Sequence, residues 1–471
     1  MKKPELRLLF LLIVVLCSRT ASGQNSDSAS FLTLSEFYGQ IMANHPLARQ
    51  AGLLSTQARQ EIRFARGNFD PKLEASYATK DFQDKNYFNT LTTALALPTR
   101  TPVIPKIGFE KRTGQFLDPS ENIPGDRQLM AGISVPLLRG VITDERRTML
   151  RQAELMTTML EAEQVKLINK LLLEAASAYW NWHYREQSFQ LFTSAAGLAG
   201  EILNRVKLNF SQGESSVLDT VQASITWQMR KVEQQEALNQ LQNARITVSN
   251  FIWDENILPL QLTGNTRPVG FDNKRRISSE ELTDLTAQAR ERHPELIKLR
   301  TKYDQLEFER VLAREFIKPK LDLQYAVLSQ PGNAQWIDPV NDFKFGLDFS
   351  MSLWLRKERA KLKMTDLKIL NTDFETRQQE RDIENNILKY FNDLTNTVAV
   401  LERQALMADS YEKLIQGELL NLQNGESDLF KINIQQEKLI QAREKLLKLE
   451  ADYEKQKAYL YWAAGVTPVA N

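Results

Sequence analysis

The segment NHPLARQ at residues 44–50 returns as RHPELIK at residues 292–298. In each copy a Pro-Lys-Leu triplet follows at the same distance, beginning at Pro71 in the first copy and at Pro319 in the second. A match that keeps its register over so long a separation indicates that the chain contains two copies of one structural unit.

The His-Pro pairs inside these segments predict helix boundaries. Proline fits the first turn of a helix and disfavours helical backbone for the residue before it, so His45 and His293 should each separate two helices. The alternative, in which these histidines bind a metal ion, lacks Cys, His or Glu partners at ligand spacing. We therefore predict structural histidines and no metal site.

Composition and motifs exclude several classes of protein. The 471 residues carry a formal net charge of +1, and no basic stripe with interleaved aromatic residues points to nucleic acid. Glycine-rich phosphate loops, HExxH and nucleophile motifs are not evident in the sequence. We therefore expect neither an enzyme nor a cofactor.

The N-terminal sequence predicts a signal peptide over residues 1–23. Lys2 and Lys3 precede the apolar run LRLLFLLIVVLC, and the small residues ASG follow it. The alternative is that Cys17 accepts a lipid, although Leu16 stands where a small residue is expected. Both readings take the protein out of the cytoplasm.

Two long windows predict helical hairpins. Residues 137–258 and 340–467 contain no proline and few glycines, which is typical of uninterrupted helix. We expect hairpins at about 140–256 and 355–465, with a first limb of about 70 residues, or roughly 100 Å. Helices of this length must pack along one another as coiled coils.

The tip of each hairpin is marked by the same triplet. Gly-Glu-Ser occurs at residues 213–215 and again at residues 425–427. Glycine suits the left-handed residue that ends a helix, and a serine can cap the next helix. The tips are therefore placed at Gly213 and Gly425.

Alternating apolar and polar residues predict two strands in each copy. The clearest case is FKFGLDFSMSL, within a strand at about 342–353, which pairs with one at about 319–328. The equivalent strands of the first copy are at about 71–79 and 127–137. The loop over residues 78–131 is much longer than its equivalent, and whether it adds strands stays open.

The chain thus divides into a first structural repeat at 24–256, a linker at 257–276 and a second repeat at 277–471. Four strands of about ten residues match the length that crosses a bilayer in a tilted β-barrel. Because four strands cannot close a barrel, and an open edge in lipid leaves backbone groups unpaired, several chains would have to combine. The alternative is a soluble sheet whose apolar face is covered by helix.

Taken together, these features resemble the TolC-like outer membrane channel family, also called outer membrane factors. The resemblance is carried by the duplicated His-Pro pairs, the two Pro-Lys-Leu strand starts, the GISVPLLRG segment at residues 132–140 and the paired GES tips. It extends from about residue 31 to about residue 465. The order and duplication of these motifs are more specific than any one of them.

The resemblance implies a mainly α fold with β, internally duplicated. Three chains would form a homotrimer with a twelve-stranded barrel in the cell outer membrane, continued through the periplasm by a coiled-coil α-helical barrel. Such channels are passive exit ducts for efflux or type I secretion, together with a periplasmic adaptor and an inner membrane pump. The alternative function is a periplasmic coiled-coil scaffold or adaptor without a transmembrane barrel.

In the family, the hairpin tips form the periplasmic aperture and dock onto the adaptor. The resemblance assigns this role to Gly213, Glu214, Ser215 and Asp219 at the first tip, and to Gly425, Glu426, Ser427 and Lys431 at the second. Some members carry an arginine and an acidic residue where this chain has Ser427 and Lys431, so their salt bridge and acidic filter do not carry over. We expect Asp219 and Lys431 either to pair across a closed aperture or to be solvated cap charges.

Overall fold

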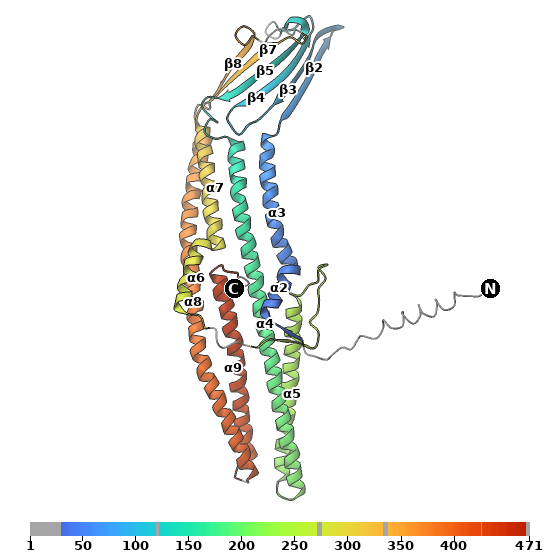
Figure 1. The fold of residues 1–471 in the computed structure, drawn as a ribbon, viewed down its shortest axis with the longest axis vertical. Coiled ribbons are helices and arrows are strands. Elements are labelled where there is room, and N and C mark those ends of the chain that lie inside the picture. The colour runs from blue at the N-terminus through green and yellow to red at the C-terminus, as the bar shows by residue number, and fades with distance from the viewer. Residues whose placement is uncertain (1–29, 119–121, 271–275, 333–337, 425, 468–471) are drawn as a thin grey trace, which may run out of the picture. The chain divides into compact units, whose positions relative to one another are not determined.

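The computed structural model describes residues 30–118, 122–270, 276–332, 338–424 and 426–467 (Figure 1). The predicted signal peptide, Cys17, Gly425 and part of the predicted linker lie outside these residues. The fold is mainly helical with one large sheet, and the internal duplication predicted from the sequence is confirmed.

The two copies contain equivalent elements in the same order. The first contains β1 (Ser30–Leu32), α2 (Leu34–Asn44), α3 (Pro46–Arg66), β2 (Lys72–Phe82), β3 (Lys85–Ala96), β4 (Ile104–Thr113), β5 (Arg127–Pro136), α4 (Glu145–Ser211) and α5 (Val217–Ser249). The second contains β6 (Thr266–Pro268), α6 (Ser279–Arg292), α7 (Pro294–Ile317), β7 (Lys320–Ser329), β8 (Phe343–Ser350), α8 (Arg356–Gln423) and α9 (Leu429–Ala463). The long helices α4 and α8 start after the second predicted strand of each copy.

The described residues form two compact units, and each unit takes segments from both copies. The first unit contains the described residues of 1–45, 175–275 and 397–455, and the second those of 46–174, 276–396 and 456–471. The compact units therefore differ from the sequence repeats. The sheet lies in the second unit, and both hairpin tips lie in the first.

Both His-Pro pairs lie at helix boundaries, as predicted. His45 ends α2 with extended backbone and Pro46 begins α3. His293 ends α6 and caps α7, where its Nδ1 accepts a hydrogen bond from the backbone N–H of Glu295 at 3.2 Å. Burial lowers the pKa of both imidazoles, and that of His293 falls to about 4.

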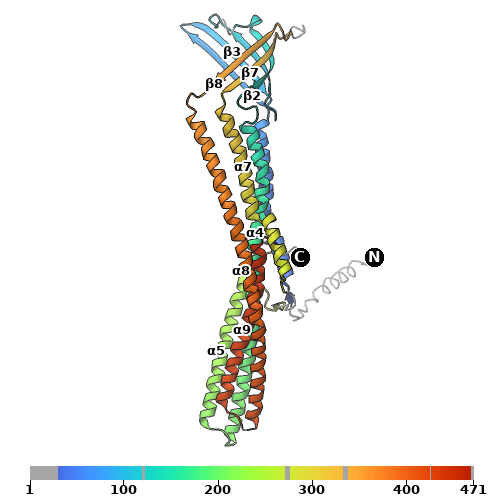
Figure 2. The ribbon, with the colours of Figure 1, turned by 90° about the vertical axis from the view of Figure 1, so that its left-hand side faces the viewer.

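The sheet has six antiparallel strands in the order β2-β3-β4-β5-β7-β8 (Figures 1 and 2). The four predicted strands correspond to β2, β5, β7 and β8. The other two, β3 and β4, occupy the 78–131 loop whose content the sequence left open. The alternation of apolar and polar residues in β3 is weak because one of its faces carries small residues such as Thr92 and Ala94 rather than charges.

Two local features fix this sheet. A two-residue turn joins β2 to β3, and its residues Gln83 and Asp84 have φ angles of 52° and 55°, as a type I′ hairpin turn requires. At Gly132 in β5, a Cβ atom would lie 2.2 Å from the carbonyl oxygen of Tyr325 in β7. A side chain at this position would force β5 and β7 apart.

In the first unit, a short parallel ribbon joins the two copies. The strands β1 and β6 pair over three residues each. The Tyr179 hydroxyl of α4 donates to the Leu32 carbonyl at 2.8 Å and accepts from the Val269 N–H at 3.0 Å. Burial raises the pKa of Tyr179 to about 12, so this hydroxyl stays protonated and holds the ribbon against α4.

Candidate functional site

One face of the sheet is apolar across all six strands. Directly opposed residues of an antiparallel pair point to the same side, so the register defines rows that cross the sheet. One such row contains Leu73, Leu95, Ile107, Ala131, Val327 and Phe343. These side chains give every strand an apolar residue on the same side.

The opposite face is polar. The row on that face next to the apolar one contains Lys72, Ala96, Lys106, Gly132, Ala326 and Lys344. Elsewhere on this face, Arg112 and Glu110 form an ion pair at 3.2 Å. One side of the sheet therefore suits hydrocarbon and the other suits water.

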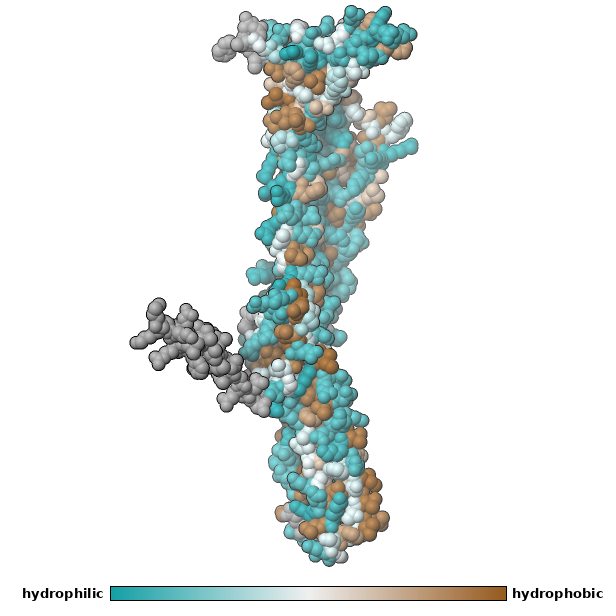
Figure 3. All heavy atoms as spheres, turned by 90° about the vertical axis from the view of Figure 1, so that its right-hand side faces the viewer, coloured by the Kyte–Doolittle hydropathy of each residue, from teal (hydrophilic) through white to brown (hydrophobic). Residues whose placement is uncertain are grey.

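The apolar face ends in polar residues toward one end of the strands. Lys111 lies opposite Arg127, and Asn89 lies opposite Thr113. In Figure 3, hydrophobic side chains gather on the lower part of the sheet and the strand ends above them are hydrophilic. An apolar band that is limited in height in this way is typical of a barrel in an outer membrane.

Both edges of the sheet are open. The edge strands are β2 and β8, which do not pair with each other. Every residue of β2 is exposed, and so is almost every residue of β8. The backbone groups along these edges are therefore available to another chain.

The two hairpin tips repeat the same turn. Gly213 has a φ of 82°, and the N–H of Glu214 donates to the Asn209 carbonyl at 2.9 Å. In the second tip, the N–H of Glu426 donates to the Asn421 carbonyl at 2.8 Å. A six-to-one bond of this kind is the mark of a Schellman turn, which the paired GES triplets encode.

The helices that follow the tips are capped differently. In α5, Ser216 and Asp219 form a reciprocal capping box, and the hydrogen bond from the Ser216 N–H lowers the pKa of Asp219. In α9, Asp428 accepts from the Lys431 N–H at 2.8 Å. Lys431 thus occupies the position of Asp219, although a helix N-terminus favours negative charge.

Some of the predicted tip residues lie together. A cavity of about 750 Å³ is lined by Glu214, Ser215 and Asp219 of the first tip and by Ser427 of the second. Gly213, Glu426 and Lys431 do not line it, and Gly425 lies outside the described residues. Within the described part of one chain, no ion pair joins Asp219 to Lys431; the Asp219 carboxylate instead accepts from Ser216 at 2.8 Å.

An ion pair that the sequence did not reveal joins the two hairpins. Arg230 of α5 is 1% exposed and lies 2.6 Å from Glu437 of α9 and 2.8 Å from Glu233. Burial acts to raise the pKa of Glu437, but the hydrogen bonds from Arg230 and Gln441 outweigh it, and the net pKa is lowered. The only signal in the sequence was an arginine three residues before a glutamate, a pattern common on solvated helices.

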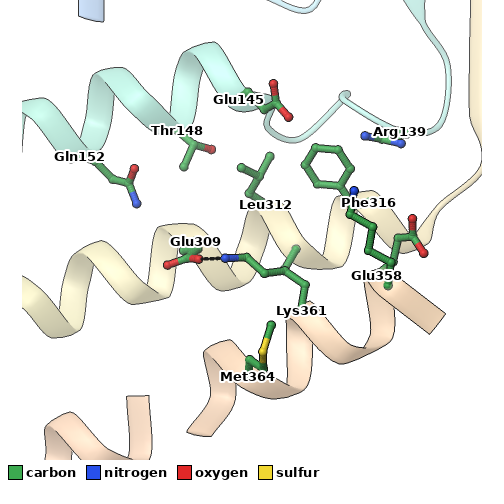
Figure 4. A pocket seen from close by; sticks show the side chains of 12 residues that line it. Arg139, Glu145, Thr148, Gln152, Glu309, Leu312, Phe316, Glu358, Lys361 and Met364 are labelled. Carbon is green, nitrogen blue, oxygen red and sulfur yellow. Dashed lines mark hydrogen bonds and ion pairs between the residues drawn. The ribbon is translucent and has the colours of Figure 1, made fainter. Parts of the chain in front are cut away.

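A second groove, of about 840 Å³, lies between α4, α7 and α8 in the second unit (Figure 4). The Arg139 guanidinium stacks 3.7 Å from the centre of the Phe316 ring, and Lys361 pairs with Glu309. In the part of the chain that the structure describes, no cluster of three His, Cys, Asp or Glu residues could hold a metal ion. The groove has mixed charge and no recognisable catalytic group.

Among the described residues, no helix combines the length and the hydropathy needed to cross a membrane.

No protein-family model and no curated protein matches the sequence. Solved structures do match. The Campylobacter jejuni CmeC outer membrane channel has a TM-score of 0.64 at 12% identity, with 96% of this chain and 92% of that chain covered. The open state of the Neisseria gonorrhoeae MtrE outer membrane channel has a TM-score of 0.64 at 14% identity and 94% coverage of both chains.

The outer membrane protein VceC from Vibrio cholerae has a TM-score of 0.63 at 13% identity, with 92% of this chain and 96% of that chain covered. Each match thus spans more than nine tenths of both chains. The chain therefore has the fold of the TolC-like outer membrane channels.

Proposed function

We propose that this protein is the outer membrane exit duct of an efflux or type I secretion system. The observation that carries the proposal is the sheet with one apolar and one polar face, built from strands of 8 to 12 residues. About 9 to 11 residues suffice for a tilted strand to cross a bilayer. The apolar face would contact lipid and the polar face would line an aqueous lumen.

The open edges require further copies of the chain. In hydrocarbon, each unpaired N–H or C=O along β2 and β8 would cost several kcal/mol. A second copy supplies the missing strand, and a closed ring of identical copies removes every edge. As in the family that it resembles, the chain would form a homotrimer.

The helices support the same assembly. Leu218, Val221, Ile225 and Val232 of α5 are between 49% and 79% exposed. Their spacing of three, four and seven residues follows the seam of a coiled coil. This seam has room for a helix of a neighbouring copy.

The hairpin tips would form the periplasmic aperture and the docking surface for a periplasmic adaptor, with an inner membrane pump supplying the energy. Three copies would bring the carboxylates of Glu214 and Glu426 to this aperture. Lys431 would face an acid of a neighbouring hairpin, such as Asp219. The unfavourable place of Lys431 at a helix N-terminus supports this role, because a partner outside the chain would offset it.

The cargo would be small molecules or proteins, and the duct itself would be passive. The second candidate is a periplasmic coiled-coil scaffold or adaptor, for which the long hairpins alone would suffice. An apolar sheet face that helices leave uncovered favours the channel.

Extraction and conductance test the proposal. We expect the full chain to leave outer membranes only in detergent, as three-fold particles that give stepwise conductance in planar bilayers. A peripheral scaffold would instead be released by salt washing and would not conduct. Release by salt without conductance would overturn the channel proposal.

A further inference from the structure

The hairpin of β3 and β4 is part of the same continuous sheet as the four predicted strands. Eleven residues of β2 pair with β3, eight of β3 pair with β4, and eight of β4 pair with β5. The structure therefore contains no direct pairing of β2 with β5, which a four-stranded wall would need.

The inserted strands follow the same division into faces as the others. Leu91 and Leu95 of β3, with Ile107 and Phe109 of β4, point to the apolar side because they lie in register with apolar residues of β2 and β5. A hairpin that projected into water would have no reason to keep an apolar row aligned with a lipid-facing one. Its pattern indicates burial in the same membrane.

The strand count permits closure. Every neighbouring pair in the sheet is antiparallel, so β2 and β8 at the two edges run in opposite directions. The β8 strand of one copy can therefore pair with the β2 strand of the next copy in the same antiparallel manner. A hairpin adds two strands, so the total stays even, as antiparallel closure requires.

We propose that β3 and β4 belong to the transmembrane wall, so that three copies of the six-stranded sheet close an eighteen-stranded barrel. The proposal rests on the proposed function, because it takes the sheet to span the outer membrane in a trimer. It deepens that function by assigning the outer membrane part of the duct a wider lumen than twelve strands would enclose.

The inserted strands widen the lumen without filling it. Barrel diameter grows roughly linearly with strand number, so eighteen strands give a diameter about 1.5-fold that of twelve. On the polar side of β3, Thr90, Thr92, Ala94 and Ala96 are small, whereas Phe88, which lies opposite Lys80, is large. The adjacent β4 position in register with Ala94 is Gly108. On its polar side β3 therefore contributes small neutral side chains at these four positions, which lie beside the charged residues Lys106 and Glu110 of β4.

Neighbouring substitutions in β3 test whether it contacts lipid. Leu95 lies in the apolar row, whereas Ala94 faces Glu74 and Gly108 on the polar side. Leu95→Arg should reduce the amount of trimer in outer membranes by about tenfold or more, because arginine on the lipid face is strongly unfavourable at depth. Ala94→Arg should assemble normally and shift the selectivity of the channel toward anions. Equal assembly of the two variants, with no change of selectivity, would overturn the proposal.

A matched pair in β7 separates this proposal from the proposed function. Leu323 is opposed by Val135 and Leu347, and Gln324 by Ser134 and Gly346. Suppose that Leu323→Arg prevents trimer assembly and Gln324→Arg does not, while the two β3 variants assemble to the same extent. The barrel then exists and β3 is outside it. If neither pair shows a difference and salt releases the protein, the channel itself is refuted.

A deletion tests the width directly. Removing residues 85–126 joins β2 to β5 through the existing Gln83–Asp84 turn, and it removes an even number of residues, so β5 keeps its faces. Electron cryo-microscopy of the native trimer in lipid should show a barrel whose diameter is about 1.5-fold that of the deletion variant. Equal diameters, or a native wall in which β2 pairs with β5, would overturn the proposal. Should the deletion variant not assemble, the strand count of the native wall decides alone.

Discussion

At the scale of the single residue, His293 combines a cap and a buried neutral imidazole. Its Nδ1 accepts the Glu295 N–H, and burial lowers its pKa to about 4, while the charge of Glu295 acts to raise it and that of Lys166 to lower it. In the unfolded chain a histidine takes up its proton near pH 6.5. The unfolded chain therefore binds more protons between about pH 6.5 and 4, and stability falls as the pH falls through this window.

The His293→Asn variant should weaken this pH dependence. Asparagine can cap α7 without titrating. As the pH falls through this window, the free energy of unfolding of the variant should therefore decrease by up to about 1.4 kcal/mol less per pH unit than that of the native protein. Thermal unfolding at several pH values between 4 and 7 measures the effect. His45 and His183, whose pKa values burial also lowers, should maintain the remaining slope. An unchanged slope would mean that His293 is already solvated in the native state.

At the scale of the element, Arg230 joins one hairpin to the other. Its side chain is almost wholly buried and contacts Glu437 of α9. The Arg230→Gln variant should weaken the contact between α5 and α9 by about 1.5–3 kcal/mol, the range for a hydrogen bond to a charged group. Amide hydrogen exchange along α9 should then accelerate by about tenfold or more.

The neighbouring Lys231→Gln variant is the control for this effect. Lys231 is exposed and its Nζ contacts only the side chain of Gln234 on the same helix among the described hydrogen bonds. Its substitution should leave exchange along α9 unchanged. Similar exchange in both variants would show that Arg230 fills space without joining the hairpins.

Elements with a strong local signal could be predicted, and those that depend on distant partners could not. The strand β8 shows strict alternation between Phe343 and Phe349, and the helices lack breakers over long windows, so both were evident. The alternation of β3 is hidden by Thr92 and Ala94, whose faces become distinct only through pairing with β2. The role of Arg230 depends on a glutamate of the other repeat, far away in the sequence.

At the scale of the whole molecule, the exposed α5 seam should control assembly. Ile225 is 62% exposed in the single chain, so a charge there would cost little in a monomer but would disrupt a helix contact between copies. The Ile225→Glu variant should therefore shift the detergent-solubilised protein from trimers to monomers. Light scattering after size-exclusion chromatography measures the change.

Gln222→Glu adds the same charge one turn earlier at a polar position of the same helix, and it should stay trimeric. Trimers of equal stability in both variants would place the contact between copies elsewhere.

The fold of the whole molecule could be predicted from the sequence because the His-Pro pairs, the strand starts and the tips recur in one order. The cargo of the proposed duct could not, because no described residue on the polar face of the sheet is specific to one ligand.

The two-residue turn at Gln83 and Asp84 has a consequence for how such proteins evolve. A hairpin that enters through so tight a turn adds one ascending and one descending strand, so every later strand keeps its direction and its faces. The insertion or deletion of such a hairpin therefore leaves the directions and the faces of the other strands unchanged. In the proposed three-fold assembly each such event would change the circumference of the barrel by six strands, so barrel widths would differ in discrete steps.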